Sequence, residues 1–117
     1  MPPPLVSVLT PNYNHGRYLQ KCLAGVSYQT FTDYEFLITD DGSTDNSRAI
    51  IEEAARGDSR IKAVFFEKNR GMVSAMENLL QRAQGKYIHW VAADDFVINK
   101  DFFQKGVTAL ENDPRPA

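Results

Sequence analysis

The sequence lacks a second cysteine, which excludes an internal disulfide, and its single thiol, Cys22, suits a reducing compartment. It also lacks any apolar run that approaches the roughly 20 residues of a membrane-spanning helix. Met1-Pro2-Pro3-Pro4 has no charged region followed by an apolar stretch, the pattern of a signal peptide. These absences lead us to expect a cytoplasmic protein.

An excess of charge of one sign is missing as well. Lys and Arg number 13 and Asp and Glu 15, so the formal net charge is −2, which argues against a surface that coats nucleic acid. With 43% hydrophobic and 24% charged residues, the 117-residue chain has the composition of an ordinary globular protein. Its length fits one small domain or part of a larger one.

Apolar runs alternate along the chain with segments of helical periodicity. The strand-like runs, rich in β-branched and aromatic residues, are 5–10, 34–39, 61–66 and 87–91. The helical patterns fall at 16–28, around 50–55 before Gly57, at 73–83 before Gly85, and from Phe102 to Leu110 before Pro114. We expect Pro11 to end the first strand, because proline donates no ladder hydrogen bond, and Ser43-Thr44-Asp45 to cap the second helix.

This β-α-β-α-β-α-β-α order predicts an α/β, Rossmann-like fold. The expected architecture is a mostly parallel sheet of about four strands with helices on both faces and right-handed crossovers. Pro114-Arg115-Pro116 is typical of the start of a connecting segment.

Polar residues follow each predicted strand, at the sheet edge where parallel α/β proteins bind ligands. The four segments are 11–16, 40–43, 67–71 and 93–96. Asn and Gly in such places commonly form turns, and Asp94-Asp95 could cap a helical turn. Adjacent carboxylates repel, however, and two acidic pairs, Asp40-Asp41 and Asp94-Asp95, indicate a divalent ion and a hydroxyl-rich ligand. Oxygen ligands of this kind suit Mn²⁺ or Mg²⁺.

The ordered set of segments resembles glycosyltransferase family 2, whose enzymes have the GT-A fold. The resemblance runs from about Val6 to Asp113. The segments that carry it are Val6 to Asn14, Gln29 to Glu35, Asp40 to Ser47, Asn69-Arg70-Gly71, Ala83 to Ile88, and Asp94-Asp95. It implies that residues 1–117 are the nucleotide-sugar-binding half of a truncated domain. The acceptor-binding half would be absent, and the catalytic base would lie beyond Ala117.

The resemblance also implies roles for individual residues. Tyr13 would stack on the nucleotide base, Pro11 would shape the same pocket, and Asp41 would accept a hydrogen bond from the base. Asp94 would bind the ribose or assist the metal, and Asp95 would coordinate the metal. The remaining residues expected to bind the nucleotide are Asn14 and, by its charge near the phosphates, Arg70.

The implied reaction is metal-dependent transfer of a sugar from a UDP-, GDP- or dTDP-linked donor, with inversion at the anomeric carbon. The acceptor would be a glycan or a lipid carrier, as in polysaccharide biosynthesis, and such enzymes often act at the inner face of a membrane. No nucleic-acid partner is expected. A homodimer through an unpaired sheet edge is a further expectation.

Two departures from the family pattern bear on the site. Ala92 stands where the family often has a further Asp, and Met76-Glu77 stands where it commonly has Arg-Asn. The second departure leaves open whether this helix contacts the sugar or the phosphates.

Other hypotheses fit less well. A non-catalytic nucleotide-binding fragment is the main alternative for these residues alone. A sugar nucleotidyltransferase would need a Gly-rich, Arg-containing loop after the first strand, and a phospho-acceptor signalling domain would need its acidic pair there. This chain has Asn12-Tyr13-Asn14-His15-Gly16 at that position.

Four further residues carry side chains able to take part in chemistry, and for each the sequence favours a structural role. We expect His15 to be a surface-loop residue, His89 a packed strand residue, Cys22 a core residue of the first helix, and Trp90 to pack under a helix.

Overall fold

The computed structural model describes residues 2–95 and 99–113, in which strands and helices alternate as expected. The elements are β1 (Val6–Asn12), α1 (Gly16–Ser27), β2 (Tyr34–Asp40), α2 (Ser47–Gly57), β3 (Ile61–Phe65), α3 (Met72–Arg82), β4 (Tyr87–Trp90) and α4 (Phe102–Glu111). The end of the segment that follows the fourth predicted strand, Phe96, and the connecting segment 114–116 lie outside the described residues.

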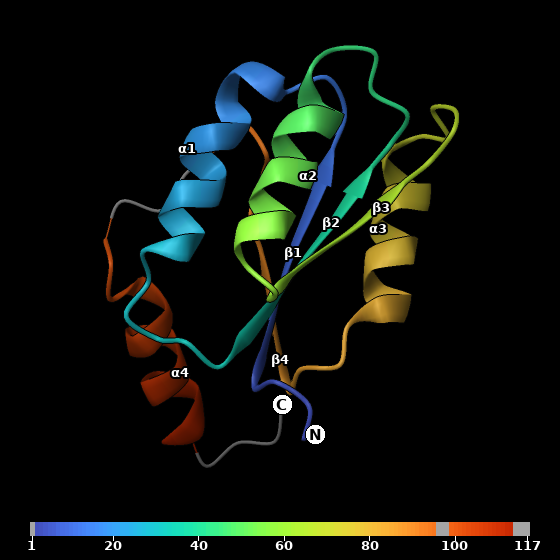
Figure 1. Cartoon of the computed structure of the whole chain (residues 1–117). Helices are drawn as coiled ribbons and strands as arrows, with labels where there is room; N and C mark the ends of the chain where they lie inside the picture. The colour runs from blue at the N-terminus through green and yellow to red at the C-terminus, as the bar shows by residue number, and fades with distance from the viewer. Residues whose placement is uncertain (1, 96–98, 114–117) are drawn as a thin grey trace.

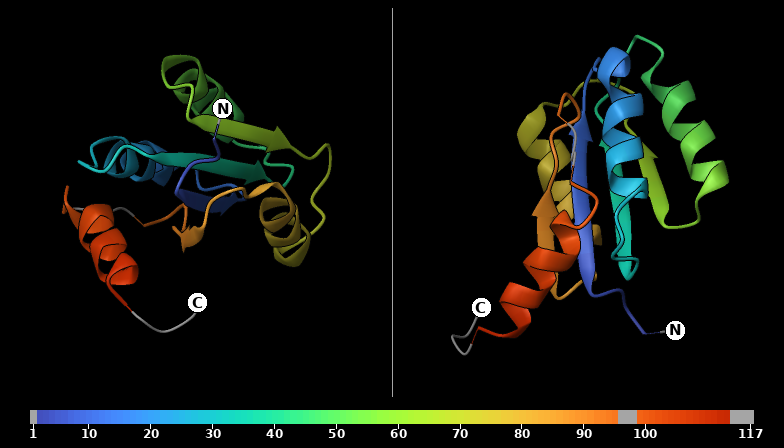
Figure 2. Two further views of the ribbon diagram at one scale, coloured as in Figure 1. Left: turned by 90° about the horizontal axis from the view of Figure 1, so that it is seen from below. Right: turned by 90° about the vertical axis from the view of Figure 1, so that its left-hand side faces the viewer.

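The four strands form one parallel sheet in the order β3-β2-β1-β4 (Figure 1). Helices α1 and α2 cover one face and α3 covers the other, while α4 lies beside β4 on the α1 side (Figure 2). The predicted fold class, a parallel sheet of about four strands with helices on both faces, is confirmed.

Two apolar clusters form the core, one on each face of the sheet. The larger joins side chains such as Val8, Phe36 and Ile38 of the strands to Leu19 of α1 and Ile51 of α2. The smaller joins Leu9, Leu37 and Leu79 under α3. Neighbouring residues of β1 and β2 therefore face opposite clusters, as the two-residue period of a strand requires.

The prediction that Pro11 ends the first strand is wrong, because β1 continues to Asn12 and Pro11 pairs with Thr39 of β2. The carbonyl of Leu9 accepts a hydrogen bond from the Val91 amide, so the backbone polar groups of Leu9 point toward β4. Those of Pro11, two residues later in the strand, point the same way. β4 pairs with β1 only as far as Leu9. Pro11 therefore lacks its N–H group at a position where β1 no longer pairs with β4.

The predicted apolar stripe of α3 is only partly buried. Ala75 and Leu79 pack in the interior, whereas Val73, Met76 and Leu80 are exposed. α3 lies over β1 and β2, so only one narrow strip of the helix faces the sheet.

The N-cap of α2 lies one residue after the predicted capping cluster, which ended at Asp45. Asn46 holds the N-cap position without a side-chain hydrogen bond, and Oδ1 of Asp45 accepts the Ser47 amide hydrogen instead. Gly57 is the last residue of α2, as the sequence predicted.

Candidate functional site

The topology creates a switch point between β1 and β4. From β1 the chain adds β2 and β3 on one side, and then crosses to the other side of β1 to form β4. The segments that leave the carboxyl ends of β1 and β4 therefore diverge, and ligands of parallel α/β proteins bind in the crevice left there.

A cavity of about 390 Å³ lies at this switch point. Its lining comes from Pro11 of β1, from His15 at the start of α1, from Met72 and Met76 of α3, and from residues 90–94 at the end of β4. This volume is within the range of roughly 300–1,000 Å³ that small-molecule sites occupy.

The loops after β1 and β2 are tied together beside this cavity. The Asn14 amide donates to Oγ of Ser43 (2.9 Å), and Oδ1 of Asn14 accepts from the Thr44 amide (2.8 Å). The Gly16 amide donates to Oδ2 of Asp45 (2.9 Å). Asn14 has a φ of 55°, a left-handed conformation that Asn tolerates better than most residues. Asn14 therefore fixes the loop, and its predicted contact with the nucleotide stays a prediction.

The acidic pair Asp40-Asp41 is buried and its charges are compensated by donors of the protein. Asp40 accepts hydrogen bonds from Nδ2 of Asn12 (2.7 Å) and Oγ of Ser43 (2.6 Å). Hydrogen-bond donors of the protein therefore compensate this pair, and the divalent ion indicated by the sequence stays a prediction for Asp94-Asp95.

Asp41 holds the loop between β3 and α3. Its carboxylate accepts hydrogen bonds from the amides of Arg70 (2.6 Å) and Gly71 (3.0 Å) and from Nδ2 of Asn69 (3.1 Å). Asp41 thus fixes this loop, and its predicted hydrogen bond with a nucleotide base stays a prediction.

The second acidic pair, Asp94-Asp95, is exposed at the end of β4. Asp94 lines the cavity, and the Asp95 amide donates to the Ala92 carbonyl (3.0 Å), which turns the chain at this point. Within residues 2–95 and 99–113, no group of three or more His, Cys, Asp or Glu side chains forms a metal site. Two exposed carboxylates fit the other mode of Mg²⁺ and Mn²⁺ binding, in which substrate phosphates and water complete the coordination.

Of the remaining predicted residues, Pro11 lines the cavity, whereas Tyr13 and Arg70 are not among its lining residues. Tyr13, two residues after Pro11, keeps 40% of its surface exposed. The guanidinium of Arg70 lies 4.3 Å from the centroid of the Phe66 ring, on the exposed loop before α3.

Two cavity residues, His15 and Trp90, were not predicted as site residues. Trp90 does lie on the face of β4 that carries α3, as expected of a residue under a helix, but it is 39% exposed and lines the cavity. The signal that could have identified them is position, since each lies within a few residues of a strand's carboxyl end.

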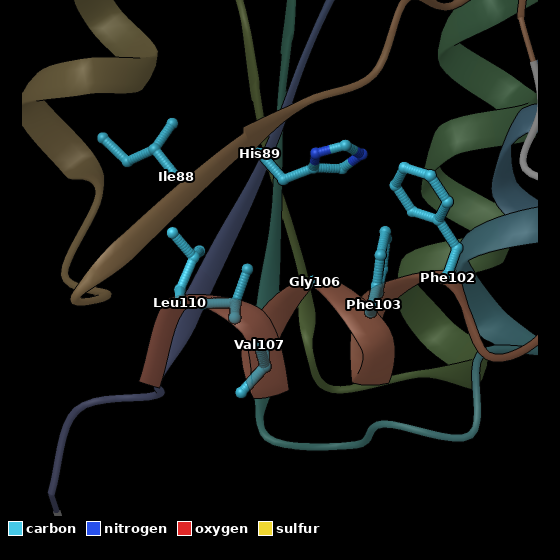
Figure 3. A pocket seen from close by; sticks show the side chains of 8 residues that line it. Ile88, His89, Phe102, Phe103, Gly106, Val107 and Leu110 are labelled. Carbon is cyan, nitrogen blue, oxygen red and sulfur yellow. The ribbon is translucent and has the colours of Figure 1, made fainter. Parts of the chain in front are cut away.

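A second, smaller cavity of about 80 Å³ lies between β4 and α4 and is mostly apolar (Figure 3). In it the His89 ring points toward Phe102 and Phe103, with ring centroids 5.3 and 5.2 Å away. Burial lowers the pKa of His89, so the ring is neutral near pH 7. This packing confirms the expectation of a structural histidine.

Cys22 is buried in α1, and burial raises the pKa of its thiol to about 12. A thiol with this pKa is protonated near neutral pH and is a poor nucleophile. The predicted role of Cys22 as a core residue is confirmed.

Among the helices in the described part of the chain, none combines the length and the apolar character needed to cross a membrane.

Known proteins of one family match most of the chain. The profile of glycosyl transferase family 2 matches residues 7–116. Glycosyltransferase GlyG of Streptococcus pneumoniae is 38% identical over 93 residues, 80% of this chain and 31% of that protein. Chondroitin synthase of Escherichia coli is 37% identical over 94 residues, 80% of this chain and 14% of that protein. The chain spans about a third of the length of curated relatives that it matches.

Solved structures share the fold. A mannosyltransferase from Pyrobaculum calidifontis in complex with GDP-Man and Mn²⁺ superposes with a TM-score of 0.85 at 24% identity, covering 96% of this chain and 33% of that one. S. aureus TarS 1–349 in complex with UDP-GlcNAc superposes with a TM-score of 0.84 at 28% identity, covering 92% of this chain and 31% of that one.

Proposed function

The chain belongs to glycosyl transferase family 2, and from this premise we propose that it binds the nucleoside diphosphate sugar donor of a glycosyltransferase. The complete enzyme transfers the sugar to a hydroxyl of an acceptor glycan or lipid carrier, with inversion at the anomeric carbon. The related chondroitin synthase supports an acceptor of the polysaccharide type.

One observation carries the proposal. The cavity at the switch point between β1 and β4 has the volume of a small-molecule site, and it is bordered by Asp94 of an exposed carboxylate pair. A site of this kind fits a ligand that combines a hydroxyl-rich part with phosphates.

The nucleotide part has a binding surface beside the cavity. We propose that the exposed ring of Tyr13 stacks on the base, an interaction of roughly 1–3 kcal/mol. Pro11 shapes the same pocket, and Asp41, whose carboxylate also accepts the Arg70 and Gly71 amide hydrogens, accepts a hydrogen bond from the base. Asn14 holds this loop in place by its bonds to the β2–α2 loop.

The phosphates are proposed to lie near Asp94 and Asp95, which would hold Mn²⁺ or Mg²⁺ together with phosphate oxygens and water. When bound, such an ion acts as a Lewis acid that stabilises the charge of the departing nucleoside diphosphate. Asp94 also orients the ribose, and Arg70 adds positive charge if its side chain leaves Phe66.

The catalytic step requires a base that deprotonates the acceptor hydroxyl. We propose that this base and the acceptor site belong to sequence beyond Ala117. The 117 residues alone are then a nucleotide-binding unit, and activity is a property of the longer protein.

Isothermal titration calorimetry with Mn²⁺ tests the proposal. UDP, GDP and dTDP and their sugar conjugates are titrated into the protein, and one nucleotide class is expected to bind. Asp95→Ala should weaken its binding at least tenfold, because one carboxylate of a two-carboxylate site is lost. Asp33→Ala removes an exposed carboxylate beyond the opposite edge of the sheet and should leave binding unchanged.

Absence of binding by every nucleotide would refute the proposal. Binding that Asp95→Ala and Asp94→Ala leave unaltered would refute the metal site and retain only a metal-free nucleotide site.

A further inference from the structure

The acidic pair Asp94-Asp95 lies in the connection between β4 and α4, and the structure fixes this connection at both ends. At the β4 end, the Val91 amide donates to the Leu9 carbonyl (3.0 Å), and the Val91 carbonyl accepts from Oγ1 of Thr10 (2.8 Å). Both bonds attach the start of the connection to β1, an interior strand of the sheet. The position of the acidic pair then depends on what holds the other end.

The other end is held by Gln29, which directly follows the C-cap of α1. Its Nε2 donates to the Asn99 carbonyl (2.8 Å), and its Oε1 accepts from the Phe103 amide (2.8 Å). Nε2 also donates to the Gly25 carbonyl in α1 (3.3 Å). The amide of one side chain thus joins the end of α1 to the segment that leads into α4, which lies beside it (Figure 1).

Gln29 is 4% exposed, which is unusual for a glutamine. Burial of an amide group costs free energy unless hydrogen bonds replace those it made with water. An apolar side chain of similar size would fill the same space without this requirement. The buried amide therefore adds a specific placement of residues 99–103 that apolar packing alone would not supply.

Thr30 adds a second set of bonds to the same segment. Its amide donates to the Lys100 carbonyl (2.8 Å), and its Oγ1 donates to Oδ1 of Asp101 (2.8 Å). Asp101 is the N-cap of α4, and its own amide donates to Oδ1 of Asn99 (2.9 Å). The turn that begins α4 is therefore attached to two consecutive residues after α1.

Only three residues separate Asp95 from Asn99, so the placement of Asn99 limits where the acidic pair can lie. Two exposed carboxylates that share an ion with substrate phosphates bind it well only if they are already near the binding geometry, because ordering on binding lowers affinity. A contact that fixes Asn99 therefore supports the acidic pair from a distance.

We propose that Gln29 is a positioning residue for the Asp94-Asp95 metal site. Its buried amide holds Asn99 and Phe103, and thereby keeps the acidic pair in the arrangement that binds Mn²⁺ or Mg²⁺ together with a nucleoside diphosphate. The proposal rests on the function proposed above and adds to it a residue that is not among those lining the cavity.

The test compares nucleotide binding with and without metal. Isothermal titration calorimetry measures the affinity for UDP, GDP and dTDP with Mn²⁺ and with EDTA, and the ratio for the nucleotide that binds gives the metal-dependent gain. Gln29→Met keeps the approximate volume of the side chain but forms none of the three hydrogen bonds. It should reduce the gain about tenfold, the lower end of what lost supporting contacts cost around metal ligands, and leave the affinity in EDTA near its wild-type value.

The Asp95 amide, bonded to the Ala92 carbonyl, reports on the same effect in the protein without ligand. Its hydrogen exchange, measured by NMR, should be faster in Gln29→Met, because the far end of the connection is no longer held. Exchange of the Val91 amide, which is bonded to β1, should be unchanged.

Two further variants separate positioning from general stability. Val107→Ala is the matched control, since Val107 is a buried residue of α4 whose apolar side chain forms no hydrogen bond. It should lower the melting temperature as Gln29→Met does and leave the metal-dependent gain unchanged. Thr30→Val removes exposed hydroxyl bonds, so it should fold and reduce the gain in the same direction as Gln29→Met, but by less.

The outcomes separate this proposal from the one on which it rests. A wild-type gain in Gln29→Met, or an equal loss in Val107→Ala, would overturn the positioning role and leave the proposed function intact. If Gln29→Met does not fold, an unaltered gain in Thr30→Val has the same meaning. A nucleotide that binds equally with Mn²⁺ and with EDTA would overturn both the positioning role and the metal site, and if no nucleotide binds, the proposed function fails as well.

Discussion

At the scale of single residues, the site depends on positions where only one side chain fits. Gly42 follows the acidic pair Asp40-Asp41 with a φ of 70°, and a Cβ atom there would lie 2.5 Å from backbone atoms of Lys68 and Asn69. Glycine therefore lets the β2–α2 and β3–α3 loops approach each other closely.

Gly42→Ala should lower the free energy of unfolding by at least about 2 kcal/mol, because it adds left-handed strain and a contact with backbone that cannot move aside. Urea denaturation followed by circular dichroism measures this change. Gly57→Ala is the matched control, since no atom lies within 4 Å of the position that its Cβ would take and alanine favours the helix by up to about 1 kcal/mol. A Gly42→Ala protein as stable as the wild type would contradict the close approach of the two loops.

The sequence predicted some site residues and missed others for a physical reason. Pro11 lies near the carboxyl end of β1 and Asp94 shortly after β4, so strand order places both at the cavity. His15 and Trp90 have ordinary structural explanations when considered singly. Their proximity depends on how far α3 and the β1–α1 loop lie from β4, which periodicity does not determine.

At the scale of elements, Arg82 joins the last turn of α3 to two strands. Its Nη1 donates to Oγ1 of Thr39 (2.9 Å) and its Nη2 to the Lys62 carbonyl (2.8 Å). Burial lowers the pKa of Arg82, an effect opposed by the nearby carboxylate of Glu35. Because the guanidinium is forked, one side chain can form hydrogen bonds with β2 and β3 at the same time.

Arg82→Ala should destabilise the protein by about 2–3 kcal/mol, because it removes a partly buried hydrogen bond to Thr39 and an exposed one to Lys62. Arg82→Lys should recover only part of this loss, since an ammonium group does not reproduce the fork. Thermal unfolding compares these variants with Gln81→Ala, an exposed neighbour whose change should stay within about 0.5 kcal/mol. Full recovery by lysine would show that charge alone, and not the fork, joins α3 to the sheet.

The order and kinds of the elements followed from periodicity, whereas their burial did not. Strand and helix bounds differ from prediction by a residue or two at most ends, as at Asn12 and Ser27. The exposure of Val73 and Leu80 could not be predicted, because the sequence shows that a helix is amphipathic but not how wide a surface its partner offers.

At the scale of the whole molecule, β4 lies at one edge of the sheet with apolar side chains on both sides. Ile88 is exposed on β4, and Phe102 and Leu110 are exposed on α4. An edge strand with apolar neighbours favours association with another chain.

We predict that this 117-residue chain associates reversibly as its concentration rises, with the weight-average sedimentation coefficient increasing in analytical ultracentrifugation. Ile88→Lys should shift the association to higher concentration, because it places a charge on the edge strand. Tyr28→Lys introduces the same charge at an exposed site at the end of α1 and should not shift it. A wild-type protein that sediments as a monomer at all concentrations would contradict this role of β4.

The position of β1 in the middle of the sheet has a consequence for synthesis. Its two neighbours are separated widely along the chain: Asn12 bonds Asp40, 28 residues away, while the Thr10 hydroxyl donates to the Val91 carbonyl, 81 residues away. On the ribosome, β1, β2 and β3 can therefore pair while β4 is still being translated. The crevice that β1 and β4 enclose exists only after Val91 has emerged from the exit tunnel, so the ligand-binding edge is completed later than the part of the sheet that β1, β2 and β3 form.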